Sequence, residues 1–164
     1  MSAGAHMACI LGVSSDHAQL NGELGEHLEE STEVMGVLAL YPPTDFLSVR
    51  KDFDGLLDYY AEDSPVTQLL GESITSAPEK SNLASPLRRF TGACPPTLFL
   101  HGEADPIVPV EQSVILHETL LAAGVDSDLM RLAGYTHGDH RFNRGAPAER
   151  INAYLKNAPP LNHN

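Results

Sequence analysis

The stretch LFLHGEADPIVP, residues 98–109, decides the fold, because an apolar run passes directly into a polar turn that contains Asp105. Residues 97–100 predict a buried strand. The segment 110–123 has an apolar face, a proline before it and a glycine after it, the usual arrangement at the two ends of a helix. Residues 128–132 predict the next strand. Strand, helix and strand in succession form one crossover unit, so the two strands are expected to be parallel neighbours.

A third strand is predicted over residues 34–40, VMGVLAL, an apolar run without alternation that is soon followed by two prolines. Such a run is typical of a parallel strand that is covered on both faces. The small apolar residues 4–13 and the amphipathic segment 147–156 predict helices before and after these strands. The expected fold class is therefore α/β, with three parallel strands flanked by helices.

Polar residues follow the predicted strands at positions suited to chemistry. Asp105 follows one strand, and His137 in the segment GYTHG follows the next. Ser2, in the segment SAGAH, matches the second half of the G-x-S-x-G turn, which presents a serine between a strand and a helix. The carboxyl ends of parallel strands lie at one edge of a sheet, so these three side chains are expected to meet there.

Three further phrases join these segments: YPPTD at 41–45, ASPL at 84–87 and HGEADPIVPVEQS at 101–113. Together they resemble the C-terminal half of an α/β-hydrolase, in the esterase and lipase group that contains acetyl esterases and feruloyl-esterase-like proteins. The order serine, aspartate, histidine is also that of the α/β-hydrolases. The resemblance covers nearly all of the 164 residues. It implies a serine hydrolase of small acyl or acetyl esters that uses no metal and no other cofactor.

The resemblance gives each site residue a role. Ser2 is expected to be the nucleophile and His137 the base, since an imidazole titrates near neutral pH and can take and return a proton. Asp105 is expected to orient the imidazole and to stabilise its charged form. The backbone N–H of Ala3 is expected to donate a hydrogen bond to the oxyanion.

Other interpretations of these residues stay open. Ser2 could be a helix N-cap, Asp105 a turn residue, and His140 could replace His137 as the base. Three residues match family positions but have structural explanations, in helix packing, a turn and a strand end: His6, Asp45 and His101. A metal-dependent hydrolase is a further alternative, because imidazole and carboxylate groups suit divalent metals. Its candidate ligands are His137, Asp139, His140, His101 and Asp105.

The whole chain, 1–164, is expected to be one partial α/β-hydrolase domain. Residues 44–94 are far too many for a simple crossover, so they predict a lid-like excursion over the pocket or a surface helix packed on the sheet. Residues 157–164 are expected to be a frayed tail.

The composition limits the partners. The formal net charge of −12 argues against nucleic acid, whose phosphates need a basic face. No apolar run approaches the roughly 18–20 residues that a membrane-spanning helix needs. The sequence shows no signal peptide, which favours a cytoplasmic location. The expected partner is therefore a small-molecule ester.

Two parts of the resembling family are not found in this sequence: the segment of the HGGG type and the strand before the serine turn. The chain is therefore expected to be a fragment, and the alternative function is a non-catalytic remnant or an assembly subunit. The strand at 34–40 would lose a neighbour, which would leave Val34, Val37, Leu38 and Leu40 half exposed. This predicts a homodimer or pairing with a missing N-terminal half.

Overall fold

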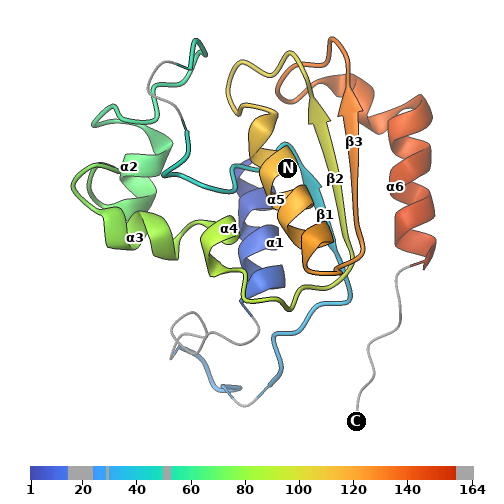
Figure 1. The fold of residues 1–164 in the computed structure, drawn as a ribbon, viewed down its shortest axis with the longest axis horizontal. Helices are drawn as coiled ribbons and strands as arrows, with labels where there is room; N and C mark the ends of the chain where they lie inside the picture. The colour runs from blue at the N-terminus through green and yellow to red at the C-terminus, as the bar shows by residue number, and fades with distance from the viewer. Residues whose placement is uncertain (15–23, 29, 50–52, 158–164) are drawn as a thin grey trace.

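The sheet has three parallel strands in the order β1-β2-β3 (Figure 1). They are β1 Val37–Leu40, β2 Thr97–Gly102 and β3 Ser127–Leu132, which confirms the predicted α/β class with three parallel strands. The computed structural model describes residues 1–14, 24–28, 30–49 and 53–157. Within this part of the chain, β1 pairs with β2 alone and is an edge strand.

β1 starts three residues later than predicted because of its partner strand. Val37 pairs with Thr97, and the chain before Thr97 consists of Pro95 and Pro96. A proline has no N–H to donate, so the ladder cannot continue toward residue 34. The last bond on this side runs from the Val37 N–H to the Pro96 carbonyl, at 2.9 Å.

Helices cover both faces of the sheet (Figure 1). α1 Ala3–Val13 and α5 Glu111–Ala122 pack on one face, and α6 Gly145–Asn157 packs on the other. All three helices were predicted, with bounds that differ by at most a few residues. β2 is buried along its whole length, as expected for the central strand.

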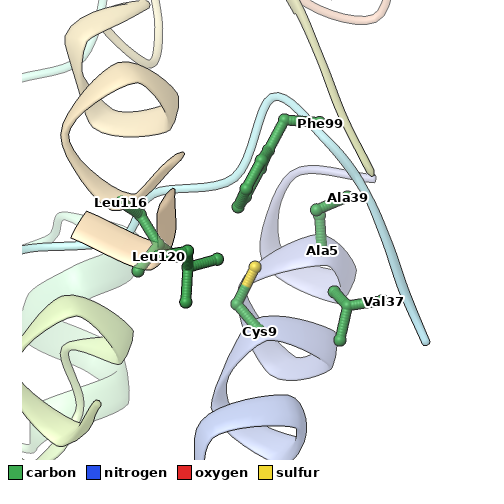
Figure 2. Close-up of a cluster of buried hydrophobic side chains, with 7 residues drawn as sticks. All are labelled: Ala5, Cys9, Val37, Ala39, Phe99, Leu116 and Leu120. Atoms are coloured by element: carbon green, nitrogen blue, oxygen red, sulfur yellow. The ribbon is translucent and has the colours of Figure 1, made fainter. Parts of the chain in front are cut away.

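The side chains of β2 alternate between two cores. Phe99 enters the core on the α1 and α5 side, where it meets Leu116 and Leu120 of α5 and Cys9 of α1 (Figure 2). Leu98 and Leu100 enter the opposite core, together with Leu40, Tyr41, Leu132 and Phe142. The sheet is thus the shared wall of two apolar cores, and its carboxyl edge is held rigidly between them.

The excursion between β1 and β2 contains three short helices, α2 Pro65–Leu70, α3 Pro78–Leu83 and α4 Pro86–Arg89. It forms a third cluster of its own, made of Phe46, Val49, Tyr59, Val66, Leu70 and Ile74. In Figure 1 it lies beside α1 and α5, away from α6. Whether it acts as a lid stays a prediction.

Residues 158–164, which make up nearly all of the predicted frayed tail, lie outside the described residues. Among the helices that are described, none has the length and apolar content needed to cross a membrane.

Candidate active site

The structure brings Ser2, Asp105 and His137 together at the carboxyl ends of the strands. Ser2 directly precedes α1, Asp105 lies in the turn after β2, and His137 lies in the loop after β3. The Ser2 Oγ is 2.9 Å from His137 Nε2, and His137 Nδ1 is 2.8 Å from Asp105 Oδ2. Since a carboxylate only accepts, Nδ1 carries the proton and Nε2 accepts from the Ser2 hydroxyl.

Ser2 is held in an unusual backbone conformation. Its φ is 49°, in the left-handed region that residues other than glycine seldom occupy. Its N–H donates to the Leu40 carbonyl at 2.9 Å and its carbonyl accepts from the His6 N–H at 2.9 Å, so sheet and helix fix it from both sides. The side chain makes no capping hydrogen bond to α1. Ser2 thus stands at the N-cap position of α1, but its hydroxyl does not cap the helix and is turned to His137.

Asp105 is a buried carboxylate whose two oxygens are both occupied. Oδ1 accepts from the N–H groups of Ile107 at 2.8 Å and Val108 at 2.9 Å, and Oδ2 accepts from His137. Burial by itself raises the pKa of Asp105, but the N–H donors of His101, His137, Val108 and Ile107 outweigh it and hold the pKa well below the usual value. Asp105 is therefore a fixed negative charge behind His137.

The ring of His137 rests on an aromatic support. The Tyr41 ring lies 4.6 Å from it, edge to face, and 5.0 Å from the Phe142 ring on another side. Tyr41 follows β1 and has a φ of 43°, a second strained residue beside the site. In the sequence, Tyr41 stands out only as part of the YPPTD phrase. Its positive φ, which places the ring under His137, has no signal in the sequence.

Ala3, the expected oxyanion donor, is the first residue of α1. The first N–H groups of a helix have no acceptor within that helix, so the Ala3 N–H is suited to bind an anion. It follows Ser2 directly in the chain.

The competing base, His140, points away from this site. Its side chain is 77% exposed, and its Nδ1 faces Asp139 at 3.7 Å. Asp139 itself is paired with Arg141, at 2.6 Å. In the described part of the chain, no three His, Cys, Asp or Glu side chains form a group that could hold a metal ion.

The three residues with structural explanations do have structural contacts. His6 packs on Phe46, and burial lowers its pKa although a hydrogen bond to the Pro43 carbonyl opposes this. Asp45 forms a bidentate pair with Arg88, at 2.7 and 3.0 Å. His101 is fully buried and lies 3.4 Å from Asp105 Oδ2.

A cavity of about 490 Å³ opens beside Asp105, between the excursion and the start of α5. Val49 and Phe53 give it an apolar wall, and Glu103 and Glu111 give it acidic groups. It offers space for part of a small ligand on the Asp105 side of the site.

The three parallel strands flanked by helices have the fold of part of an α/β-hydrolase. Residues 1–120 match the family model described as BD-FAE, and the chain belongs to this family.

Relatives agree with the family. The chain is 30% identical over 140 residues to the protein named Esterase LipC from Mycobacterium tuberculosis, a match that covers 84% of this chain and 33% of that protein. A solved structure titled as a truncated carbohydrate esterase from gut microbiota has a TM-score of 0.79 at 23% identity, covering 95% of this chain and 57% of the other. A propionate-bound esterase from Thermogutta terrifontis has a TM-score of 0.63 at 22% identity, covering 98% and 56%. The chain thus spans about a third of the length of LipC and just over half of these structures.

Proposed function

We propose that this chain carries the nucleophile, base and acid of a serine hydrolase of carboxylic esters with small acyl groups. The observation that carries the proposal is the hydrogen-bonded line from Ser2 through His137 to Asp105, with distances of 2.9 and 2.8 Å. The names of the relatives support it, since one is called an esterase and another structure is titled as an acetyl ester-xyloside bifunctional hydrolase.

In the proposed reaction, the Ser2 hydroxyl attacks the ester carbonyl while His137 Nε2 takes its proton. The carbonyl oxygen gains the negative charge, and the Ala3 N–H donates to it. The intermediate collapses, His137 returns the proton to the leaving alcohol, and the acyl group stays on Ser2. Water then attacks the acyl-enzyme while His137 takes its proton. The bond to Ser2 breaks, His137 returns the proton to the Ser2 oxygen, and the acid leaves. Asp105 stabilises the charged imidazole in each step.

The test is hydrolysis of short p-nitrophenyl esters by the parent chain and by the variants Ser2→Ala and His137→Ala. Each should lower kcat by 10³-fold or more, the order of magnitude known for removing one member of such a triad. His140→Ala is the matched control and should retain the parent rate. If His140→Ala abolishes turnover and His137→Ala does not, the base is assigned wrongly.

An organophosphate offers a second, independent readout. It should label Ser2 in the parent protein, and mass spectrometry of the N-terminal peptide would locate the adduct. Labelling of another serine would remove the nucleophile assignment. Loss of activity on addition of a chelator would favour the metal-dependent alternative.

A second candidate function is a non-catalytic or assembly subunit that depends on another chain. The free edge of β1 in the described part of the chain favours it. An incomplete oxyanion hole would cost roughly 10²–10³ in kcat for each missing donor. Robust turnover by the purified 164-residue monomer would refute this candidate. The cytoplasmic location stays a prediction that cell fractionation tests.

A further inference from the structure

A second histidine and serine pair lies behind Asp105, outside the catalytic line. His101 at the end of β2 and Ser113 in α5 are both fully buried. The Ser113 Oγ is 2.7 Å from His101 Nδ1, and the Val108 carbonyl is 2.9 Å from His101 Nε2. A carbonyl oxygen only accepts, so Nε2 carries the proton. In this tautomer Nδ1 accepts from the Ser113 hydroxyl. The Val108 carbonyl thus selects the tautomer, and Ser113 holds the ring from its other side.

The protonated Nε2 of His101 faces the group that holds Asp105. Its acceptor, Val108, uses its own N–H to bind Asp105 Oδ1 at 2.9 Å. The same Nε2 lies 3.4 Å from Asp105 Oδ2, the oxygen that accepts from His137. His101 therefore supports both carboxylate oxygens of Asp105. It holds Val108, which donates to Oδ1, and its own Nε2–H faces Oδ2 directly.

We propose that His101 is a positioning residue for Asp105, and that Ser113 holds the His101 ring in the orientation this task requires. The contacts lead from Ser113 in α5 to His101, from His101 to the Val108 carbonyl, and from the Val108 N–H to Asp105, which holds His137. This inference deepens the proposed function and rests on it for its catalytic consequence, but the positioning itself is a property of the folded chain.

The chain contains a matched control for the chemistry of this pair. His117 of α5 also has its Nδ1 beside a serine hydroxyl, that of Ser127, at 2.8 Å. The pair has the same two groups, but here α5 carries the histidine and β3 the serine. Ser127 begins β3, at the end of the strand opposite to the one that leads into the His137 loop. A substitution of His117 therefore measures the effect of losing a histidine–serine contact alone. A substitution of His101 measures in addition the effect of losing the positioning of Asp105.

Two substitutions separate the two nitrogens of His101. In His101→Gln the amide nitrogen takes the place of Nε2, so its N–H groups can still donate to the Val108 carbonyl and toward Asp105. In His101→Asn the shorter amide reaches only the place of Nδ1, so the contact with Ser113 can remain while the donor toward Val108 is lost. His117→Asn is the control, and Ser113→Ala tests whether the serine fixes the orientation of the His101 ring.

The readout is the NMR signal of the His137 Nδ1–H proton in protein that carries isotope-labelled histidine. A proton shared with a fixed carboxylate gives a low-field signal that exchanges slowly with water. We expect His101→Asn to shift this signal upfield and to speed its exchange, and Ser113→Ala to do the same to a smaller extent. His101→Gln and His117→Asn should keep the parent signal. Where the chain turns over esters, His101→Asn should lower kcat about 10-fold with little change in KM, because misplacement of catalytic groups costs rate rather than binding.

A parent-like His137 signal in folded His101→Asn would overturn the proposal, since His101 would then support only the turn. If that variant does not fold, a parent-like signal in Ser113→Ala overturns it equally. A signal lost in His117→Asn as well would mean a general loosening of α5 and would also count against it. If the signal responds as expected but neither the parent chain nor any variant hydrolyses esters, the positioning stands and the proposed function fails.

Discussion

Asp105 supplies a buried negative charge next to His137, and this charge links the stability of the fold to pH. The N–H donors around it outweigh its burial and hold its pKa below the usual value. The folded chain therefore keeps this carboxylate charged at a pH where the unfolded chain has already bound the proton. The unfolded state binds more protons below about pH 4, so stability rises with pH in that range. The contribution of Asp105 to the free energy of unfolding is therefore fully present above about pH 4, and it is lost as the pH falls toward the pKa that Asp105 has in the folded chain.

Asp105→Asn should therefore lower the thermal unfolding midpoint at neutral pH, because the uncharged amide binds the surrounding N–H donors more weakly and brings N–H groups of its own. The difference in unfolding midpoint between parent and variant should narrow as the pH falls below about 4, since the unfolded parent then binds a proton at Asp105 that the folded parent does not, which lowers the stability of the parent alone. Thermal unfolding followed by circular dichroism between neutral and acidic pH measures this. A gap that stays constant over the range would mean that the contribution of Asp105 is not electrostatic.

At the scale of elements, α1 is held against β1 at a point where no side chain fits. A Cβ at Gly12 would lie 2.5 Å from Cγ2 of the buried Val37. Gly4 lies in the same helix, and a Cβ there would meet nothing within 4 Å. Substitution of Gly4 by alanine therefore measures the effect of helix propensity alone, and substitution of Gly12 measures it together with the effect of overpacking.

Gly12→Ala should destabilise the fold by about 1–3 kcal/mol, the usual cost of overpacking a core. Gly4→Ala should instead stabilise it by about 0.5–1 kcal/mol, because alanine loses less conformational freedom in a helix than glycine does. Chemical denaturation of both variants gives the two free energies of unfolding. If Gly12→Ala is as stable as Gly4→Ala, α1 does not approach β1 as closely as the structure has it.

A buried side chain of α5, that of Gln112, fastens the start of the excursion to the core. The Oε1 of Gln112 in α5 accepts from the N–H groups of Thr44 at 2.8 Å and Asp45 at 2.7 Å. Both N–H groups belong to buried residues, so loss of their shared acceptor should cost about 1–3 kcal/mol for each. Gln112 therefore links the start of the excursion to the helix that follows Asp105.

Gln112→Leu should make residues 53–94 more sensitive to limited proteolysis, while Gln112→Glu, which keeps an acceptor, should do so much less. Gln68→Leu is the control, since Gln68 is bonded only at the protein surface. Mass spectrometry of the early cleavage products locates the cuts. Equal protection of residues 53–94 in the parent and in Gln112→Leu would show that the apolar cluster of the excursion holds it without this anchor.

The elements differ in how far the sequence predicts them. The strands and long helices follow from apolar runs, and Ser2, Asp105 and His137 follow from strand ends, which meet by topology. The three short helices of the excursion were not predicted individually, although each begins with a proline, at Pro65, Pro78 and Pro86, as helix starts often do. The role of Gln112 could not be predicted, because its partner Thr44 is 68 residues away and only the folded chain brings them together.

At the scale of the whole molecule, the free edge of β1 is a backbone feature and not an apolar surface. The sequence led us to expect that several apolar side chains of this strand would be half exposed. Val34 and Leu38 are half-buried, but the expectation is wrong for Val37 and Leu40. Val37, Ala39 and Leu40 are buried, because helices pack on the strand from both faces. The N–H groups of Val37 and Tyr41 bond to the β2 side. Alternation along the strand therefore directs the backbone groups of Leu38 and Leu40 to the free edge.

This edge is closed at only one end in the described part of the chain. The Leu40 carbonyl accepts from the Ser2 N–H, and Leu38 lies further along the same edge. An open, nearly apolar edge strand is a template for pairing with another strand, since unpaired backbone groups gain hydrogen bonds by it. We therefore expect the isolated chain to self-associate through β1 at low micromolar concentration. Sedimentation velocity and light scattering measure this directly.

Leu38→Pro is the variant that tests the edge. It removes the outward N–H of Leu38 but leaves the bonds of Val37 and Tyr41 to the β2 side intact, so it should shift the protein toward monomer without opening the sheet. Thermal unfolding checks that the variant remains folded. A parent chain that is a monodisperse monomer with one cooperative transition would contradict the prediction. In that case the Ser2 bond and the covering helices would suffice to protect β1, and the two cores around the three strands would form a complete folding unit.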